Sequence, residues 1–313
     1  MVIFARIWMP VVSVINYKGG VGKTTLTANL GAELAWRRKK VLLIDLDPQA
    51  SLTFSLVKPE DWLRHLEPSK TIKQWYDSLA SGEAMELSNL IHQPMVARKL
   101  RSGGVLHLIP SHLGLINVDL ELATELGGAS LRQNKLNYLR VHRRLSEGLA
   151  EETFNEYDLI LIDCPPNFNV VTKTAIVASD HVLIPAKADY LSTLGIDYLR
   201  RSLNELVGDY NDYAKLEDGK GGTDRIDPTI LGVVFTMMQI YGGEPISAQR
   251  PFMSQTAALG VPVFANYLRE NKSLFADAPR EGIPVVLNGS AGARKVVSEL
   301  EGLVSEFSAK LGM

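Results

Sequence analysis

The sequence lacks several features that define particular classes of protein. It has one cysteine, Cys164, among 313 residues, which excludes a disulfide framework and any metal or iron–sulfur centre built from the cysteines of one chain. This composition suits a reducing cytoplasm. No apolar run is long enough to cross a bilayer. Residues 1–8 lack the small-residue cleavage site of a signal peptide. Met9 stands just before the first strand pattern, so we expect residues 1–8 to be an N-terminal extension or an alternative start.

The sequence also lacks a large excess of either charge, because its formal net charge is only -2. No global field therefore attracts nucleic acid, and any contact with DNA has to come from a local patch. The remaining composition, 46% hydrophobic and 22% charged, is that of a globular protein. Apolar strand patterns alternate with amphipathic helix patterns along the chain. This order predicts an α/β fold, a doubly wound, mostly parallel sheet flanked by helices, as one domain over 9–313.

The most informative stretch is 11–25, VVSVINYKGGVGKTT. A β-branched run predicts a buried strand, a glycine-rich loop follows, and a helix pattern begins at the lysine and threonines. Glycines allow backbone N–H groups to turn toward an anion, and the helix N-terminus adds partial positive charge. Lys23 is expected to reach the β- and γ-phosphates of a nucleotide, and the Thr24 hydroxyl to ligate Mg²⁺. The predicted phosphate loop comprises Gly19, Gly20, Val21, Gly22, Lys23, Thr24 and Thr25.

Acidic residues end two further strand patterns. The run 41–44 is followed by Asp45, Asp47 and a proline, and the run 158–162 is followed by Asp163 and two prolines. Open α/β sheets bind ligands at the carboxyl ends of their strands. A carboxylate there, beside a phosphate loop, suits the water shell of Mg²⁺. A single aspartate in either place is also explained as a helix cap or a chance match, so its weight comes from the order of all three motifs.

Together these motifs resemble the ParA/MinD family of P-loop ATPases. The loop has Tyr17 where the general pattern has glycine, and it carries Lys18 five residues before Lys23, as in the deviant form of the motif. The resemblance implies that Lys18 crosses a homodimer interface to the partner's nucleotide. It also implies that Asp47 positions the attacking water and that Asp45 helps to organise the Mg²⁺ shell. The expected cofactors are therefore ATP and Mg²⁺.

Less specific matches continue along the chain. Thr236 and Met237 resemble a pair that lies near the nucleotide base in relatives, and Ser192 with Gly195 resemble the start of a family helix, expected here over 193–208. The stretch 52–104 corresponds to a family region of variable length, for which short helices are expected. The polar, glycine-rich stretch 208–228 predicts an exposed loop.

The resemblance implies an ATP-dependent dimer that binds DNA non-specifically, associates with the nucleoid and hydrolyses ATP when a ParB-like partner stimulates it, in plasmid or chromosome partition. Candidate phosphate contacts are the basic residues of the C-terminal third, for each of which a solubility role is an equal alternative: Arg269, Lys272, Arg280, Arg294 and Lys295. The last helix pattern, 291–311, has glutamates on its polar side. We therefore expect it to pack on the sheet rather than to bind a membrane.

Two other functions remain open at this point. The first is a positioning ATPase for another cargo, such as a polar, secretion, cellulose or compartment assembly, which the phosphate loop does not distinguish from DNA partition. The second is a metabolic P-loop enzyme that uses ATP on a small molecule. Lys18 and the string from Asp45 to Ser51 favour the switch ATPase over the metabolic enzyme.

Overall fold

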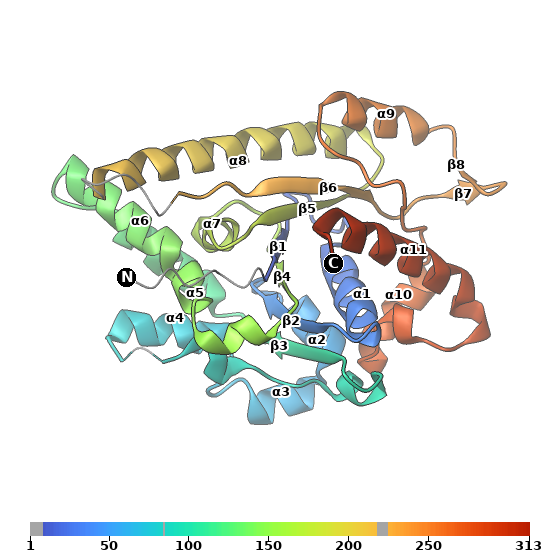
Figure 1. The fold of residues 1–313 in the computed structure, drawn as a ribbon, viewed down its shortest axis with the longest axis horizontal. Coiled ribbons are helices and arrows are strands. Elements are labelled where there is room, and N and C mark those ends of the chain that lie inside the picture. Colours follow the sequence, from blue (N-terminus) through green and yellow to red (C-terminus); the bar gives the residue numbers. More distant parts are fainter. Residues whose placement is uncertain (1–8, 84, 218–224) are drawn as a thin grey trace.

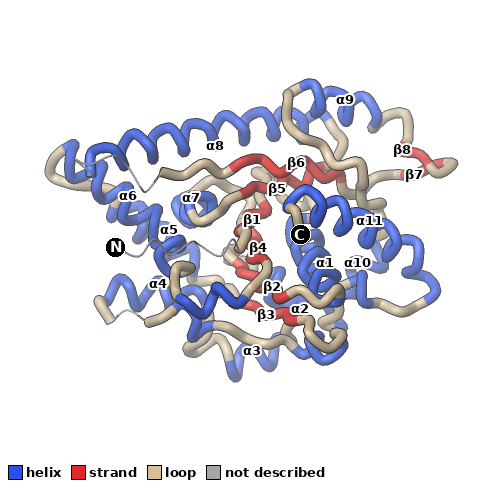
Figure 2. The backbone as a smooth tube through the Cα atoms, viewed as in Figure 1, coloured by secondary structure: helices blue, strands red, loops and turns tan. Residues whose placement is uncertain are grey.

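The computed structural model describes residues 9–83, 85–217 and 225–313. Its centre is a six-stranded parallel sheet with the strand order β3-β2-β4-β1-β5-β6. The strands are β1 (Val11–Val14), β2 (Lys40–Asp45), β3 (Val105–Ile109), β4 (Leu159–Asp163), β5 (His181–Ala186) and β6 (Thr229–Phe235). Figure 2 shows these strands between layers of helices. The doubly wound α/β fold predicted from the sequence is thereby confirmed.

Helices cover both faces of the sheet, because strand side chains alternate between the two sides. In β4, Ile160 and Ile162 point into one core and Leu159 and Leu161 into the other. The first core is covered by α4 (Ile72–Ser81), α5 (Leu115–Glu125), α6 (Leu131–Gly148), α7 (Val170–Val177) and α8 (Tyr190–Glu217). The second is covered by α1 (Lys23–Trp36), α2 (Ser51–Leu56) and α11 (Arg294–Leu311). Both layers are visible in Figure 1.

Smaller elements complete the described chain. They are α3 (Pro59–His65), α9 (Arg250–Ala258), α10 (Lys272–Glu281), the hairpin β7 (Ile240–Tyr241) and β8 (Glu244–Pro245), and five 3-10 helices, η1 (Leu87–Leu90), η2 (Met95–Lys99), η3 (Glu152–Glu156), η4 (Val285–Leu287) and η5 (Ala291–Ala293). The short helices expected within 52–104 are thus present. No helix of the described residues is long and apolar enough to span a membrane.

One expectation about the chain after residue 208 needs correction. The stretch 208–217 is not a loop, because α8 continues through it to Glu217, while 218–224 lie outside the described residues. Tyr210 and Ala214 extend the helix by packing in a small cluster with Leu139 and Val177. The last helix, α11, packs in the core on one face of the sheet, as expected, where its apolar side chains join those of the strands, and it also contacts α1 and η4 (Figure 1). The proposed extension at 1–8 also lies outside the described residues.

Candidate functional site

The phosphate loop joins the end of β1 to the start of α1 at Lys23. Gly20 and Gly22 adopt φ angles of 66° and 80°, and the space where a side chain on Gly20 would project is open. Both angles lie in the left-handed region that glycine adopts without strain. The backbone can therefore curl around an anion at the N-terminus of a fourteen-residue helix.

Lys23 lies inside this loop and is almost fully buried. Its Nζ donates to the carbonyl oxygen of Asn16 at 3.3 Å. Burial lowers the pKa of Lys23, and the nearby carboxylates of Asp163 and Asp47 oppose that shift. A buried cation with one neutral acceptor has bonding capacity left for a phosphate.

The two strand-end acids meet because β2 and β4 are neighbours. Asp45 and Asp163 are paired residues in the parallel register and both are buried. The Thr24 hydroxyl donates to Asp163 Oδ2 at 2.7 Å, which joins the phosphate loop to β4. Burial raises the pKa of both Asp163 and Asp45, and the neighbouring Asp163 carboxylate raises the pKa of Asp45 further.

Asp45 has its oxygens occupied by the protein. Oδ2 accepts from the amide and the hydroxyl of Thr53 at 2.8 and 2.7 Å, and Oδ1 accepts from the amide of Asp47 at 3.1 Å. Buried Ser111 continues this network, since its Oγ donates to the carbonyl oxygen of Asp47 at 2.6 Å and its amide donates to Thr53 Oγ1 at 2.9 Å. Asp45 therefore anchors the turn that carries Asp47, and its place in a Mg²⁺ shell stays a prediction.

The oxygen donors fit a magnesium site of a particular kind. No group of three or more His, Cys, Asp or Glu side chains in the described residues is arranged to hold a metal ion. A threonine hydroxyl and a carboxylate do lie in contact beside the phosphate loop. Mg²⁺ prefers oxygen ligands and usually keeps several waters, with substrate phosphates completing its shell. Thr24 and Asp163 suit that arrangement better than a closed protein cage.

Lys18 is held within its own chain. Its Nζ contacts both carboxylate oxygens of Asp189 at 2.7 and 2.9 Å and Ser192 Oγ at 3.3 Å. The side chains of Lys18 and Asp189 remain 33% and 40% exposed. Burial raises the pKa of Asp189, but hydrogen bonds from Lys18 and Ser192 outweigh it and hold the pKa below its usual value. Sequence reasoning found Ser192 but missed Asp189, which lies 171 residues from Lys18.

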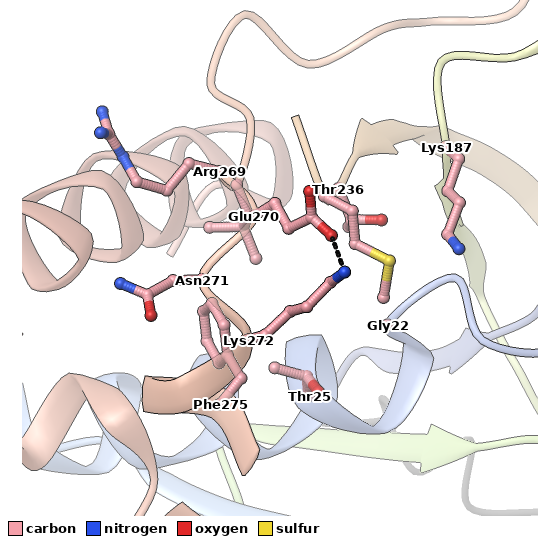
Figure 3. A pocket seen from close by; sticks show the side chains of 11 residues that line it. Gly22, Thr25, Lys187, Thr236, Arg269, Glu270, Asn271, Lys272 and Phe275 are labelled. Atoms are coloured by element: carbon pink, nitrogen blue, oxygen red, sulfur yellow. Dashed lines mark ion pairs between the residues drawn. The ribbon is translucent and has the colours of Figure 1, made fainter. Parts of the chain in front are cut away.

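A cavity of about 300 Å³ opens beside Gly22 and Thr25. Thr236 forms part of its wall and donates to the carbonyl oxygen of Val21 at 2.7 Å, and Met237 adopts a φ of 53° next to it. Figure 3 shows Lys187 facing the cavity from one side and the ion pair between Glu270 and Lys272 across it. Five of the cavity residues were not predicted from the sequence, since no local motif marks them: Lys187, Leu268, Glu270, Asn271 and Phe275.

The basic candidates for DNA contact separate into two groups. Arg269 forms a close ion pair with Glu299 and is mostly buried, so its charge is balanced within the fold. Lys272 pairs with Glu270 at 3.4 Å in the cavity wall. The other three are exposed and have no ion pair with any described residue: Arg280, Arg294 and Lys295.

The parallel sheet, the glycine loop leading into α1 and the acids at the ends of β2 and β4 define a P-loop nucleotide-binding protein. Comparison with known proteins agrees. A family described as an AAA domain matches residues 9–216. The chromosome-partitioning ATPase Soj of Thermus thermophilus is 30% identical over 301 residues, which cover 94% of this chain and 96% of that protein. The chain therefore belongs to the Soj/ParA family of P-loop ATPases.

Solved structures share the fold. The apo form of McdA from Cyanothece superposes with a TM-score of 0.67 at 22% identity, covering 96% of this chain and 100% of that one. Cobyrinic acid a,c-diamide synthase from Mycobacterium smegmatis, solved with an ATP analogue and magnesium, gives 0.67 at 22% identity over 95% and 93% of the chains. At this identity the likeness concerns the fold alone. The fold is thus found in proteins of more than one activity.

Proposed function

We propose that this ATPase acts in plasmid or chromosome partition as a switch, in which ATP with Mg²⁺ joins two copies of the chain and hydrolysis separates them. The observation that carries the proposal is the position of Lys18. Its ammonium lies at the surface beside the phosphate loop, apart from buried Lys23, and only side chains of α8 and the residue before it hold it there. A lysine held only by these contacts can leave them for a nucleotide brought by a second copy.

The surface around Lys18 supports this choice of partner. Apolar side chains project from the first three turns of α8 and are more than half exposed: Tyr190, Leu191, Leu194 and Tyr198. Tyr198 packs on Tyr17, at a ring distance of 5.2 Å, immediately before Lys18 in the chain. Contiguous exposed apolar groups mark interaction sites. A second copy, related by twofold symmetry, would cover this patch and present its own Lys18 to the site.

The proposed roles of the residues combine their positions with the family resemblance. Bound ATP supplies the phosphoryl group, and Mg²⁺ neutralises part of its charge. Lys23 and the backbone amides of 19–24 hold the phosphates, while Thr24, Asp45 and Asp163 orient the metal's ligands and waters. Asp47, on the turn anchored by Asp45, orients the attacking water. Lys18 of the second copy stabilises the charge that develops as the phosphoryl group leaves.

The wider cycle is proposed from the family. The ATP-bound dimer binds DNA without sequence preference in the cytoplasm, at the nucleoid, and a ParB-like partner stimulates hydrolysis and releases it. Phosphate contacts make such binding steeply dependent on salt. Positioning of a cargo other than DNA uses the same switch, and the neighbouring gene distinguishes the two.

Size-exclusion chromatography with light scattering tests the proposal. Wild type and Asp47→Ala are compared with ATP and Mg²⁺, with and without a mixed-sequence DNA duplex, and each is repeated with ADP. We expect Asp47→Ala to accumulate as a dimer with ATP and to retain DNA, because it cannot complete hydrolysis. An Asp47→Ala protein that binds ATP and stays monomeric contradicts the switch, and equal DNA retention with ADP contradicts ATP control.

A further inference from the structure

A positively charged hollow lies where the 52–104 segment meets the C-terminal helix, away from the phosphate loop. Its volume is about 580 Å³. Three basic side chains line it, and they come from three separate parts of the chain: Lys99 at the end of η2, Arg101 in the following turn and Arg294 at the start of α11. All three residues are exposed. The fold therefore brings cations from segments distant in sequence together around one hollow.

Acidic residues offset these cations only in part. Glu33 and Glu301 also line the hollow. Glu33 is buried and forms an ion pair with Arg37 at 2.7 Å, so its charge is already balanced. Glu301 is exposed, so three cations face one carboxylate that is not balanced elsewhere in the described chain. Among the residues that the structure describes, none forms an ion pair with the three basic side chains. In a chain with a net charge of -2, this excess of positive charge is local, as a site for a polyanion requires.

Close packing fixes the position of this surface. The turn before β3 lies directly on the end of α1, where a methyl group added to Gly104 would come within 2.0 Å of the Ala35 carbonyl oxygen. Only glycine permits this approach. The Arg101 guanidinium then lies over the Trp36 ring, 4.5 Å from its centroid. A guanidinium that stacks on a ring in this way keeps its own N–H groups available as hydrogen-bond donors.

We infer that Lys99, Arg101 and Arg294 form a surface that binds the phosphodiester backbone of DNA. The inference rests on the proposed DNA-binding function and gives it a location. Separate exposed cations from three segments suit a linear polyanion, whose phosphates are contacted one at a time. The 52–104 segment thereby receives a role, since it supplies two of the three cations. A twofold dimer doubles the number of phosphate contacts, which explains how joining two copies would strengthen binding to DNA.

Salt-dependent DNA binding tests this location. Fluorescence anisotropy with a mixed-sequence duplex is measured in a non-hydrolysable ATP analogue with Mg²⁺ for wild type and for Lys99→Gln/Arg294→Gln. Each lost phosphate contact lowers the slope of log K against log salt by about 0.9. The double variant should thus lose about 1.8 of slope per protomer and bind at least about tenfold more weakly at moderate salt.

The matched control is Arg132→Gln/Arg201→Gln, which removes the same charge from α6 and α8 on the other face of the sheet (Figure 1). It should keep the wild-type slope. Thermal unfolding verifies that both double variants are folded. If wild type binds DNA and the hollow variant keeps its affinity and slope, the location is wrong while the proposed function stands. If wild type binds no DNA at any salt concentration, the DNA-binding function and this surface are both wrong.

Discussion

The ion pair between Lys18 and Asp189 predicts that the chain resists its own dimerisation. If Lys18 has to reach a nucleotide on a second copy, it must first leave Asp189, which it contacts at 2.7 Å. The change Asp189→Asn removes the negative charge. An asparagine oxygen still accepts the hydrogen bond from the Ser192 amide, 2.8 Å away in the wild type, so the cap of α8 is preserved.

The size of the effect follows from exposure. Both side chains of the pair are a third or more exposed, and ion pairs of this kind contribute only about 0.5–1 kcal/mol. Two pairs are broken in a symmetric dimer, so the substitution should favour dimerisation by about 1–2 kcal/mol. The dimer dissociation constant in ATP should therefore fall by a factor of about 5–30.

Sedimentation velocity over a concentration series, in a non-hydrolysable ATP analogue with Mg²⁺, measures this constant. The control is Asp212→Asn, which removes the same charge from a pair with Lys215 near the other end of α8. It should leave dimerisation at the wild-type value. An Asp189→Asn protein that dimerises no better than wild type would show that the pair with Lys18 does not hold the monomer back.

Three further substitutions test the packing of the core, of the hollow and of the turn that carries Asp47. Burial lowers the pKa of His142 to about 4 from 6.5. Between these two pH values the unfolded chain therefore binds a proton at His142 that the folded chain does not bind. Stability should be complete above pH 6.5 and fall by up to about 3 kcal/mol as the pH drops to 4; His142→Gln should remove this slope in urea unfolding. Gly104→Ala should destabilise the fold by about 1–3 kcal/mol in urea, because the new methyl group meets the Ala35 carbonyl; unchanged stability would contradict the packing. Ser111→Ala should lower kcat for ATP hydrolysis about fivefold with little change in KM, because the turn carrying Asp47 loses one partly buried hydrogen bond; a change in KM alone would contradict this role.

The parts of the site that the sequence predicts are those built from contiguous residues. The phosphate loop lies within one strand–loop–helix unit, and the acids at the ends of β2 and β4 follow from the rule that parallel strands place their carboxyl ends together. The register then brings Asp45 beside Asp163. A pattern that depends only on local spacing and sheet direction is readable without a structure.

Other features depend on the order of the strands, which the sequence does not reveal. Asp189 reaches Lys18 because β5 lies next to β1, and Lys187 reaches the cavity for the same reason. Lys99 and Arg294 line the same hollow although they are far apart in the sequence. The continuation of α8 past residue 208 could not be predicted from the sequence, because this part of the helix has a polar composition and few apolar contacts.

Mixing two inactive variants tests the exchange of lysines between subunits most directly. Lys18→Ala and Asp47→Ala should each abolish DNA- and partner-stimulated ATP hydrolysis. In a mixed dimer, one site combines an intact Asp47 with an intact Lys18 from the other subunit. Half of the dimers in an equal mixture are mixed, so the account predicts about a quarter of the wild-type rate. If Lys18 serves the nucleotide of its own chain, every site keeps one defect and the mixture stays inactive, which would contradict the account.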